Sequence, residues 1–150
     1  MFMKHSKMET QKEQSPSLPP PEITGFPNRI TLELSAGCNL SCVMCPRKYV
    51  SNGNGFMKND LFRHIVHQLR GKAIESIVPF FRGEPLLHPD FFEMIRILKE
   101  TLSAKIQLAT NALLLDRCTS KYLLKLGIDF ISFSLDAIRK NTYETIRKGG

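Results

Sequence analysis

Residues 29–47 of this 150-residue chain read RITLELSAGCNLSCVMCPR, and they hold the features that decide its fold. The first part, residues 29–35, alternates apolar and polar side chains in the manner of a half-buried β-strand. The second part contains Cys38, Cys42 and Cys45 in the spacing C-x3-C-x2-C. Glycine, asparagine and proline around these cysteines interrupt regular structure, so we predict a strand that leads directly into a cysteine loop.

The three cysteines indicate a metal or cluster site. Three thiols on one loop suit a disulfide framework poorly, because disulfides require an even number of cysteines. Structural zinc normally has four protein ligands, and four-iron clusters usually bind four thiolates, so a triplet leaves one position for another group. The alternatives are a zinc site completed through the fold by Cys118 or a histidine, buried cysteines on one helix face, and a redox-sensing thiol group.

Composition excludes several classes of function. The net charge is +7, but the lysines and arginines are scattered and form no dense basic run with interleaved aromatic residues. We therefore expect no nucleic-acid partner. The N-terminus lacks the apolar stretch of a signal peptide, and no apolar segment is long enough to cross a membrane, so we expect no membrane partner. Reactive thiols without an export signal indicate a reducing, cytoplasmic location.

The rest of the chain alternates between strand-like and helix-like patterns. Residues 1–28 are polar and then proline-rich, so we expect a disordered lead-in before a folded domain at residues 29–150. We expect the following elements from the apolar periodicity. The strands are 29–35, 74–81, 105–109 and 129–135, the cysteine loop is 36–56 with a flexible turn at 52–55, and the helices are 58–70, 90–102, 117–126 and one from about 139.

Four β-α units in succession predict a mainly parallel sheet with right-handed crossovers. In such folds the functional site lies at the carboxyl ends of the strands. Polar residues do follow each predicted strand: the cysteines, then residues 82–85 (RGEP), Thr110-Asn111 and 134–136 (SLD). Each group alone is explained by a turn or a helix cap. Their convergence on one edge of the sheet predicts a site.

The cysteine loop and these strand ends together resemble the radical S-adenosylmethionine (radical SAM) enzymes over residues 29–150. Residues 38–47 resemble the form in members that modify peptides and proteins and carry a C-terminal auxiliary-cluster (SPASM-type) domain. Residues 82–85 resemble the family's Gly-Gly-Glu-Pro, and residues 110–112 its Thr-Asn-Gly. The resemblance implies an α/β fold, a partial (β/α) barrel with about four of the usual six β-α units. The chain would then be the N-terminal part of the core domain, a fragment whose fourth strand is an open edge.

The resemblance also implies a chemistry. Cys38, Cys42 and Cys45 would hold three irons of a [4Fe–4S] cluster, and S-adenosylmethionine would chelate the fourth. One electron, from a donor of the flavodoxin or ferredoxin type, would cleave that molecule to methionine and a 5′-deoxyadenosyl radical. The radical would abstract hydrogen from a substrate that the sequence does not identify, with a peptide as the candidate. The alternative is a non-catalytic iron–sulfur or zinc-binding fragment.

The resemblance further implies which residues contact S-adenosylmethionine: Met44, Gly83, Glu84, Asn111, Ser134 and Asp136. The Gly83-Glu84 turn would accept its amino group, the backbone beside Met44 its adenine, and the other three its carboxylate and ribose. An acidic acceptor suits a cationic amine, and polar donors suit a carboxylate. The chain departs from the family pattern at Arg82, Met44 and Ala112. The motifs assign no catalytic residue.

Overall fold

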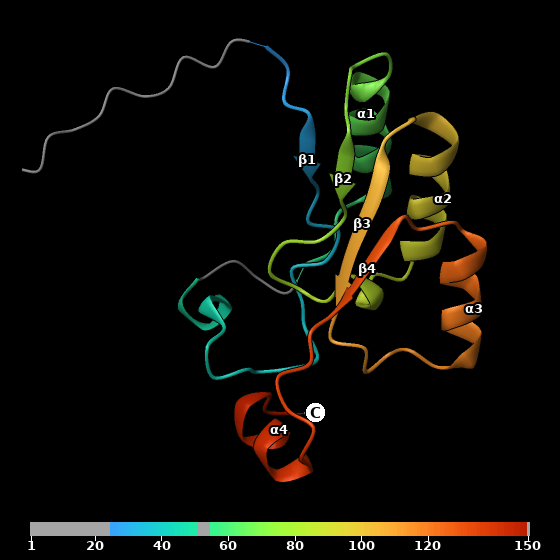
Figure 1. Cartoon of the computed structure of the whole chain (residues 1–150). Coiled ribbons are helices and arrows are strands. Elements are labelled where there is room, and N and C mark those ends of the chain that lie inside the picture. The colour runs from blue at the N-terminus through green and yellow to red at the C-terminus, as the bar shows by residue number, and fades with distance from the viewer. Residues whose placement is uncertain (1–24, 51–54, 150) are drawn as a thin grey trace, which may run out of the picture.

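The structure, a computed structural model, describes residues 25–50 and 55–149. Most of the predicted lead-in and of the predicted turn at 52–55 lies outside these residues. The described chain forms one parallel four-stranded sheet (Figure 1). Its strands are β1 (Arg29–Thr31), β2 (Ser76–Val78), β3 (Lys105–Thr110) and β4 (Phe130–Phe133). They lie side by side in chain order, each parallel to the next, so the predicted α/β fold of the partial-barrel type is confirmed.

Helices follow the strands as predicted. They are α1 (Asn59–Leu69), α2 (Phe91–Thr101), α3 (Arg117–Lys125) and α4 (Lys140–Ile146), and two short 3-10 helices are η1 (Pro46–Tyr49) and η2 (Pro85–Leu87). In Figure 1, α1, α2 and α3 cover one face of the sheet. The cysteine loop and α4 instead lie beyond the carboxyl ends of the strands.

The core lies between the sheet and the first two helices. Four apolar side chains of α2 recur at helical spacing, and all four are buried: Phe91, Met94, Ile95 and Leu98. Burying a side chain of this kind contributes about 1.5–3 kcal/mol. In contrast, α3 buries Leu123 alone among its residues, and α4 buries none. The apolar packing therefore concentrates on β1, β2 and β3.

Three of the strands are shorter than predicted. Pro79 follows β2 directly and has no backbone N–H to continue the ladder. Beyond β1 and β4 the parallel pairing continues for one residue only, through Leu32 N to Val78 O (2.9 Å) and Ser134 N to Thr110 O (2.9 Å). Further along, Ser35 forms an isolated antiparallel bridge with Phe56 instead. Among the polar residues that follow β2, β3 and β4, Glu84, Asn111 and Ser134 line one pocket.

The sheet is open at β4. Among the described residues no strand pairs with its outer edge. Phe130 and Phe133 in this strand are 58% and 56% exposed. None of the described helices combines the length and the apolar character that crossing a membrane requires.

Candidate cofactor and metal site

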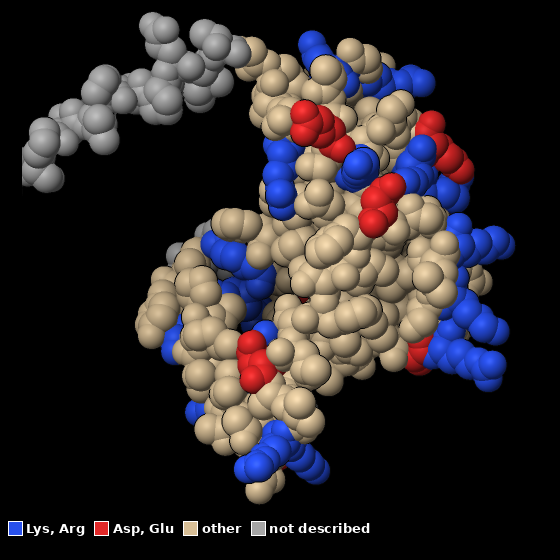
Figure 2. Space-filling view, viewed as in Figure 1, with Lys and Arg blue, Asp and Glu red and all other residues tan. Residues whose placement is uncertain are grey.

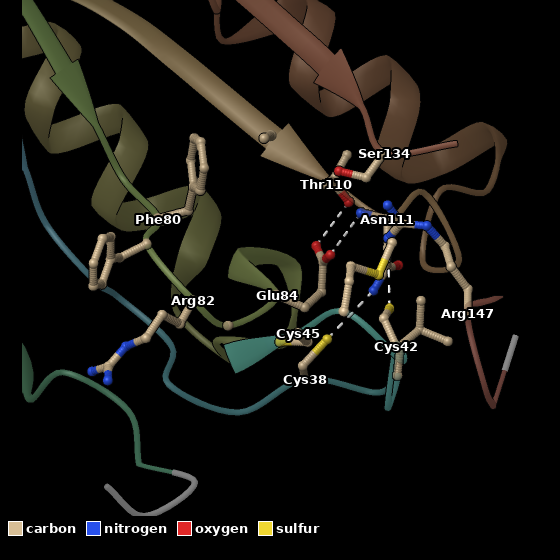
Figure 3. Close-up of a pocket in the computed structure, with 15 residues that line it drawn as sticks. Cys38, Cys42, Cys45, Phe80, Arg82, Glu84, Thr110, Asn111, Ser134 and Arg147 are labelled. Carbon is tan, nitrogen blue, oxygen red and sulfur yellow. Dashed lines mark hydrogen bonds between the residues drawn. The ribbon is translucent and has the colours of Figure 1, made fainter. Parts of the chain in front are cut away.

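A pocket of about 240 Å³ lies at the carboxyl ends of the strands, between the sheet and the cysteine loop (Figure 3). The face in view in Figure 2 is hollowed between the cysteine loop and the sheet, and basic side chains lie at this hollow. The pocket lining contains every residue that the sequence nominated except Asp136: Cys38, Cys42, Met44, Cys45, Gly83, Glu84, Asn111 and Ser134. The structure therefore brings together groups that lie far apart in sequence.

Glu84 joins two strand ends. Its side chain is buried, with 2% of the residue exposed. One carboxylate oxygen accepts from Thr110 Oγ1 (2.7 Å) and Leu86 N (3.2 Å), and the other accepts from Asn111 N (2.8 Å). A carboxylate offers about four acceptor positions, so one remains for a further donor. Without these donors, burial of the charge would be costly.

Gly83 lets the turn after β2 lie directly on the cysteine loop. A Cβ atom at this position would lie 2.0 Å from Ser35 O and 2.5 Å from Gly37 O. The next residue, Glu84, donates its N–H to the same Gly37 O (2.7 Å). Only glycine permits this approach, which is one reason that the motif requires it.

Asn111 connects β3 to the cysteine loop. Its amide Nδ2 donates to Asn39 Oδ1 (2.7 Å) and to Cys38 Sγ (3.8 Å), while its Oδ1 accepts from Leu113 N (3.0 Å). Asn39, between the first two cysteines, was not nominated from sequence. No local sequence pattern marks Asn39 as part of the site, because its partner Asn111 is 72 residues away.

Two arginines that the sequence did not nominate also belong to the site. Arg47 donates to three carbonyl oxygens of the cysteine loop: Ala36 O (3.3 Å), Leu40 O (3.2 Å) and Cys38 O (3.5 Å). Arg147, just after α4, lines the pocket and donates to Cys42 Sγ (3.8 Å). Arg47 has one sequence signal, its place two residues after the third cysteine, and Arg147 has none.

Asp136 pairs with Arg147 and lies outside the pocket lining. Its Oδ2 accepts from Arg147 Nε at 2.5 Å. Burial acts to lower the pKa of Arg147, but the hydrogen bond and charge of Asp136 outweigh it, and the pKa is raised. Burial also raises the pKa of the Cys42 thiol; Arg147 opposes this shift, and Cys38 and Cys45 add to it.

Arg82 stands where the resemblance expects glycine, and it is one of the residues that line the pocket. Its guanidinium, however, points away from Glu84 and the cysteines in Figure 3. The backbone N–H and the guanidinium of Arg82 both donate to the Glu33 carboxylate, at 2.9 and 3.2 Å. A half-buried ion pair with Glu33, which follows β1 in the sequence, therefore explains how an arginine fits at position 82.

The donor set suits an iron–sulfur cluster better than zinc. Among residues 25–50 and 55–149 no three His, Cys, Asp or Glu side chains surround a point where a single ion could bind. A cluster binds each thiolate through a different iron, and three soft thiolates in one pocket match that requirement. Of the candidates for a fourth zinc ligand that the structure describes, Cys118, His64, His67 and His88, none lines the pocket. His88, one of them, is engaged with Met57 O (3.0 Å) and Asp90 N (3.0 Å).

A parallel partial barrel with a three-cysteine loop at its strand ends defines a cofactor-dependent α/β protein. Residues 32–150 match the Radical SAM superfamily, and the chain belongs to this superfamily. Proteins of this family use a [4Fe–4S] cluster and S-adenosylmethionine.

Several characterised proteins are similar to the chain. It is 36% identical over 109 residues to the tungsten-containing aldehyde ferredoxin oxidoreductase cofactor-modifying protein of Pyrococcus furiosus, covering 71% of this chain and 30% of that protein. It is 32% identical over 126 residues to the AdoMet-dependent heme synthase of Methanosarcina barkeri, covering 83% of this chain and 36% of that protein. The chain thus spans about a third of these relatives' length.

Solved structures agree with the fold. BtrN in complex with S-adenosylmethionine and 2-DOIA has a TM-score of 0.68 and 25% identity, covering 79% of this chain and 50% of that one. The native enzyme anSMEcpe with bound S-adenosylmethionine and the Cp18Cys peptide has a TM-score of 0.63 and 26% identity, covering 81% and 35%.

Proposed function

We propose that this chain binds a [4Fe–4S] cluster through Cys38, Cys42 and Cys45, with S-adenosylmethionine beside it, as the N-terminal part of a radical SAM enzyme. One observation carries the proposal: the three cysteines and the polar ends of β2, β3 and β4 line a single pocket. When bound, the cluster supplies the electron for reductive cleavage of S-adenosylmethionine to a 5′-deoxyadenosyl radical that abstracts hydrogen from substrate.

The chain's own residues would bind and orient the small molecule. Glu84 keeps one acceptor position, which suits the ammonium group of the methionine moiety. The hydroxyl of Ser134 lines the same pocket and can donate to a carboxylate or ribose oxygen. The backbone beside Met44 is the proposed adenine contact.

Two further predicted contacts, Asn111 and Asp136, already have hydrogen-bond partners in the structure. Asn111 uses both its amide oxygen and its amide nitrogen within the protein, so we propose that it orients Cys38 as well as facing the pocket. The Oδ2 atom of Asp136 accepts from Arg147, so a contact with the ribose would use its other carboxylate oxygen.

Substrate and partners are proposals about the whole protein. The peptide-bound anSMEcpe supports a peptide substrate, as does the resemblance of the cysteine loop to peptide-modifying members. The named relatives act on other molecules, so the described residues support the cofactor half of the reaction more strongly than its substrate. An electron donor of the flavodoxin or ferredoxin type, a cytoplasmic location and an auxiliary-cluster domain remain predictions.

Anaerobic reconstitution with iron and sulfide tests the proposal. The wild-type chain should take up both, and dithionite with S-adenosylmethionine should then yield 5′-deoxyadenosine. The matched control replaces all three cysteines by alanine and should bind neither iron nor sulfide; a Cys118→Ala control should behave as wild type. One tightly bound zinc, with no uptake of iron and sulfide, would contradict the proposal and favour the non-catalytic zinc-binding alternative.

A further inference from the structure

The last residue of α4 and the residues directly after it bind the middle of the cysteine loop. The residues on either side of Cys42 donate their backbone N–H groups to it: Ser41 N to Lys148 O (2.8 Å) and Val43 N to Ile146 O (2.9 Å). Carbonyl groups at the end of a helix lack partners within the helix, so the loop satisfies groups that the helix leaves free. Cys42 is thereby fixed between two backbone contacts with a segment about a hundred residues away.

Arg147 lies between those two carbonyl groups and reaches the cysteine itself. Its Nη1 donates to Cys42 Sγ (3.8 Å), and its Nε donates to Asp136 Oδ2 (2.5 Å). Its side chain is only 12% exposed, whereas Arg96, which forms ion pairs on the surface of α2, is 48% exposed. A partly buried, charge-assisted pair restricts the guanidinium more firmly than a surface pair does.

We propose that Arg147, held in place by Asp136, is a positioning residue for Cys42 in the cluster site. This inference rests on the proposed function, because it assumes that Cys42 binds iron. The guanidinium orients the sulfur and donates a hydrogen bond to it, and Asp136 fixes the guanidinium through a second nitrogen. Only arginine presents several donors in a rigid fork, so lysine cannot make both contacts in this geometry.

Two measurable consequences follow from this role. Groups that orient metal ligands contribute about 10- to 100-fold to metal affinity. Hydrogen bonds to the sulfurs of an iron–sulfur cluster also influence its reduction potential. Reduction adds negative charge, which a nearby cation and N–H donor stabilise, so Arg147 should make the potential less negative. A purely structural tie between α4 and the loop would not shift the potential in this direction.

The test compares reconstituted wild type with Arg147→Gln, Arg147→Lys and Asp136→Asn, with Arg96→Gln as the matched control. Iron release to a chelator and the reduction potential are measured without S-adenosylmethionine, so that no contact between Arg147 and that molecule affects the result. Circular dichroism first establishes that each variant folds.

Arg147→Gln should release iron about 10-fold faster or more and shift the potential to a more negative value. Arg147→Lys retains the positive charge, so its reduction potential should lie between those of wild type and Arg147→Gln, but it should release iron faster than wild type. Asp136→Asn should release iron at a rate between those of wild type and Arg147→Gln. Arg96→Gln should match wild type. If Arg147→Gln does not fold, the lysine and asparagine variants decide the question by the same readouts.

The outcomes separate the two claims. Wild type that takes up no iron and sulfide would contradict the proposed function. Wild type that binds the cluster, with folded Arg147 variants that match it in both iron release and potential, would overturn this inference alone. Asp136→Asn that matches wild type in iron release would remove Asp136 from the arrangement.

Discussion

The part of the molecule built from β1 to β3 with α1 and α2 is stabilised differently from the part built from β4 and α4. The first part supplies most of the buried apolar side chains. The second part leaves Phe130, Phe133, Leu135 and Ile138 exposed, and α4 buries no residue. The first part supplies Glu84 and Asn111 to the pocket, and the second supplies Ser134 and Arg147. One half of the site is therefore held by a packed core, and the other mainly by hydrogen bonds.

The largest expected effect lies in the packed core. Phe62→Ala should lower the free energy of unfolding by about 3–5 kcal/mol, because Phe62 is fully buried in α1 against the sheet. Phe133→Ala, in the exposed strand β4, should change it by only about 0.5 kcal/mol. Urea unfolding followed by circular dichroism measures both. Equal losses in the two variants would show that the two parts are packed alike.

Gly83→Ala should cost about 1–3 kcal/mol or more, since a methyl group there would clash with the backbone of Ser35 and Gly37. It should also weaken iron uptake, because the cysteine loop would move. Gly55→Ala is the matched control, as its added methyl group would meet no atom within 4 Å. A Gly83→Ala chain that unfolds and binds iron like the control would contradict the close approach.

Glu84→Gln should lower the free energy of unfolding by about 1–3 kcal/mol. An amide has one donor group in place of an acceptor oxygen, and that group would face the N–H or O–H donors of Asn111 or Thr110. Glu100→Gln, on the exposed face of α2, should lose much less. Chemical unfolding of both variants checks this expectation. Equal losses would mean that Glu84 is not the tether between β2 and β3.

A smaller effect concerns Asp129, which links the two parts. The Ile106 N–H (2.8 Å) and then Lys99 (2.9 Å) lower the pKa of its carboxyl group. The stabilising contribution of Asp129 is thus fully present at any pH above the ordinary pKa of aspartate, about 4. It is lost as the pH falls through the lowered pKa of the folded state. Because the side chain is about a third exposed, we expect less than about 1 kcal/mol.

Unfolding of Asp129→Asn and wild type between about pH 2 and pH 7 measures this contribution. The two curves should differ at neutral pH and approach each other in acid. A difference that stays constant over the whole range would show that the charge of Asp129 does not stabilise the start of β4.

The sequence predicted the strands and helices because their apolar periodicity is local, and it predicted the pocket because parallel strands end at one edge. It did not predict Arg147 or Asn39 as parts of the site. Their partners lie 105 and 72 residues away, and no local pattern marks contacts of that kind. It also overestimated strand length, because strand-like sequence continues past Pro79 and past the last residues of β1 and β4 that pair within the parallel sheet.

The most direct test of the central claim is electron paramagnetic resonance of the reconstituted, dithionite-reduced chain with and without S-adenosylmethionine. If Cys38, Cys42 and Cys45 hold a four-iron cluster with one iron free of protein ligands, the reduced protein should give a cluster signal, and adding the small molecule should change that signal. A reduced cluster signal that S-adenosylmethionine leaves unchanged, or one that persists after all three cysteines are replaced by alanine, would contradict the account.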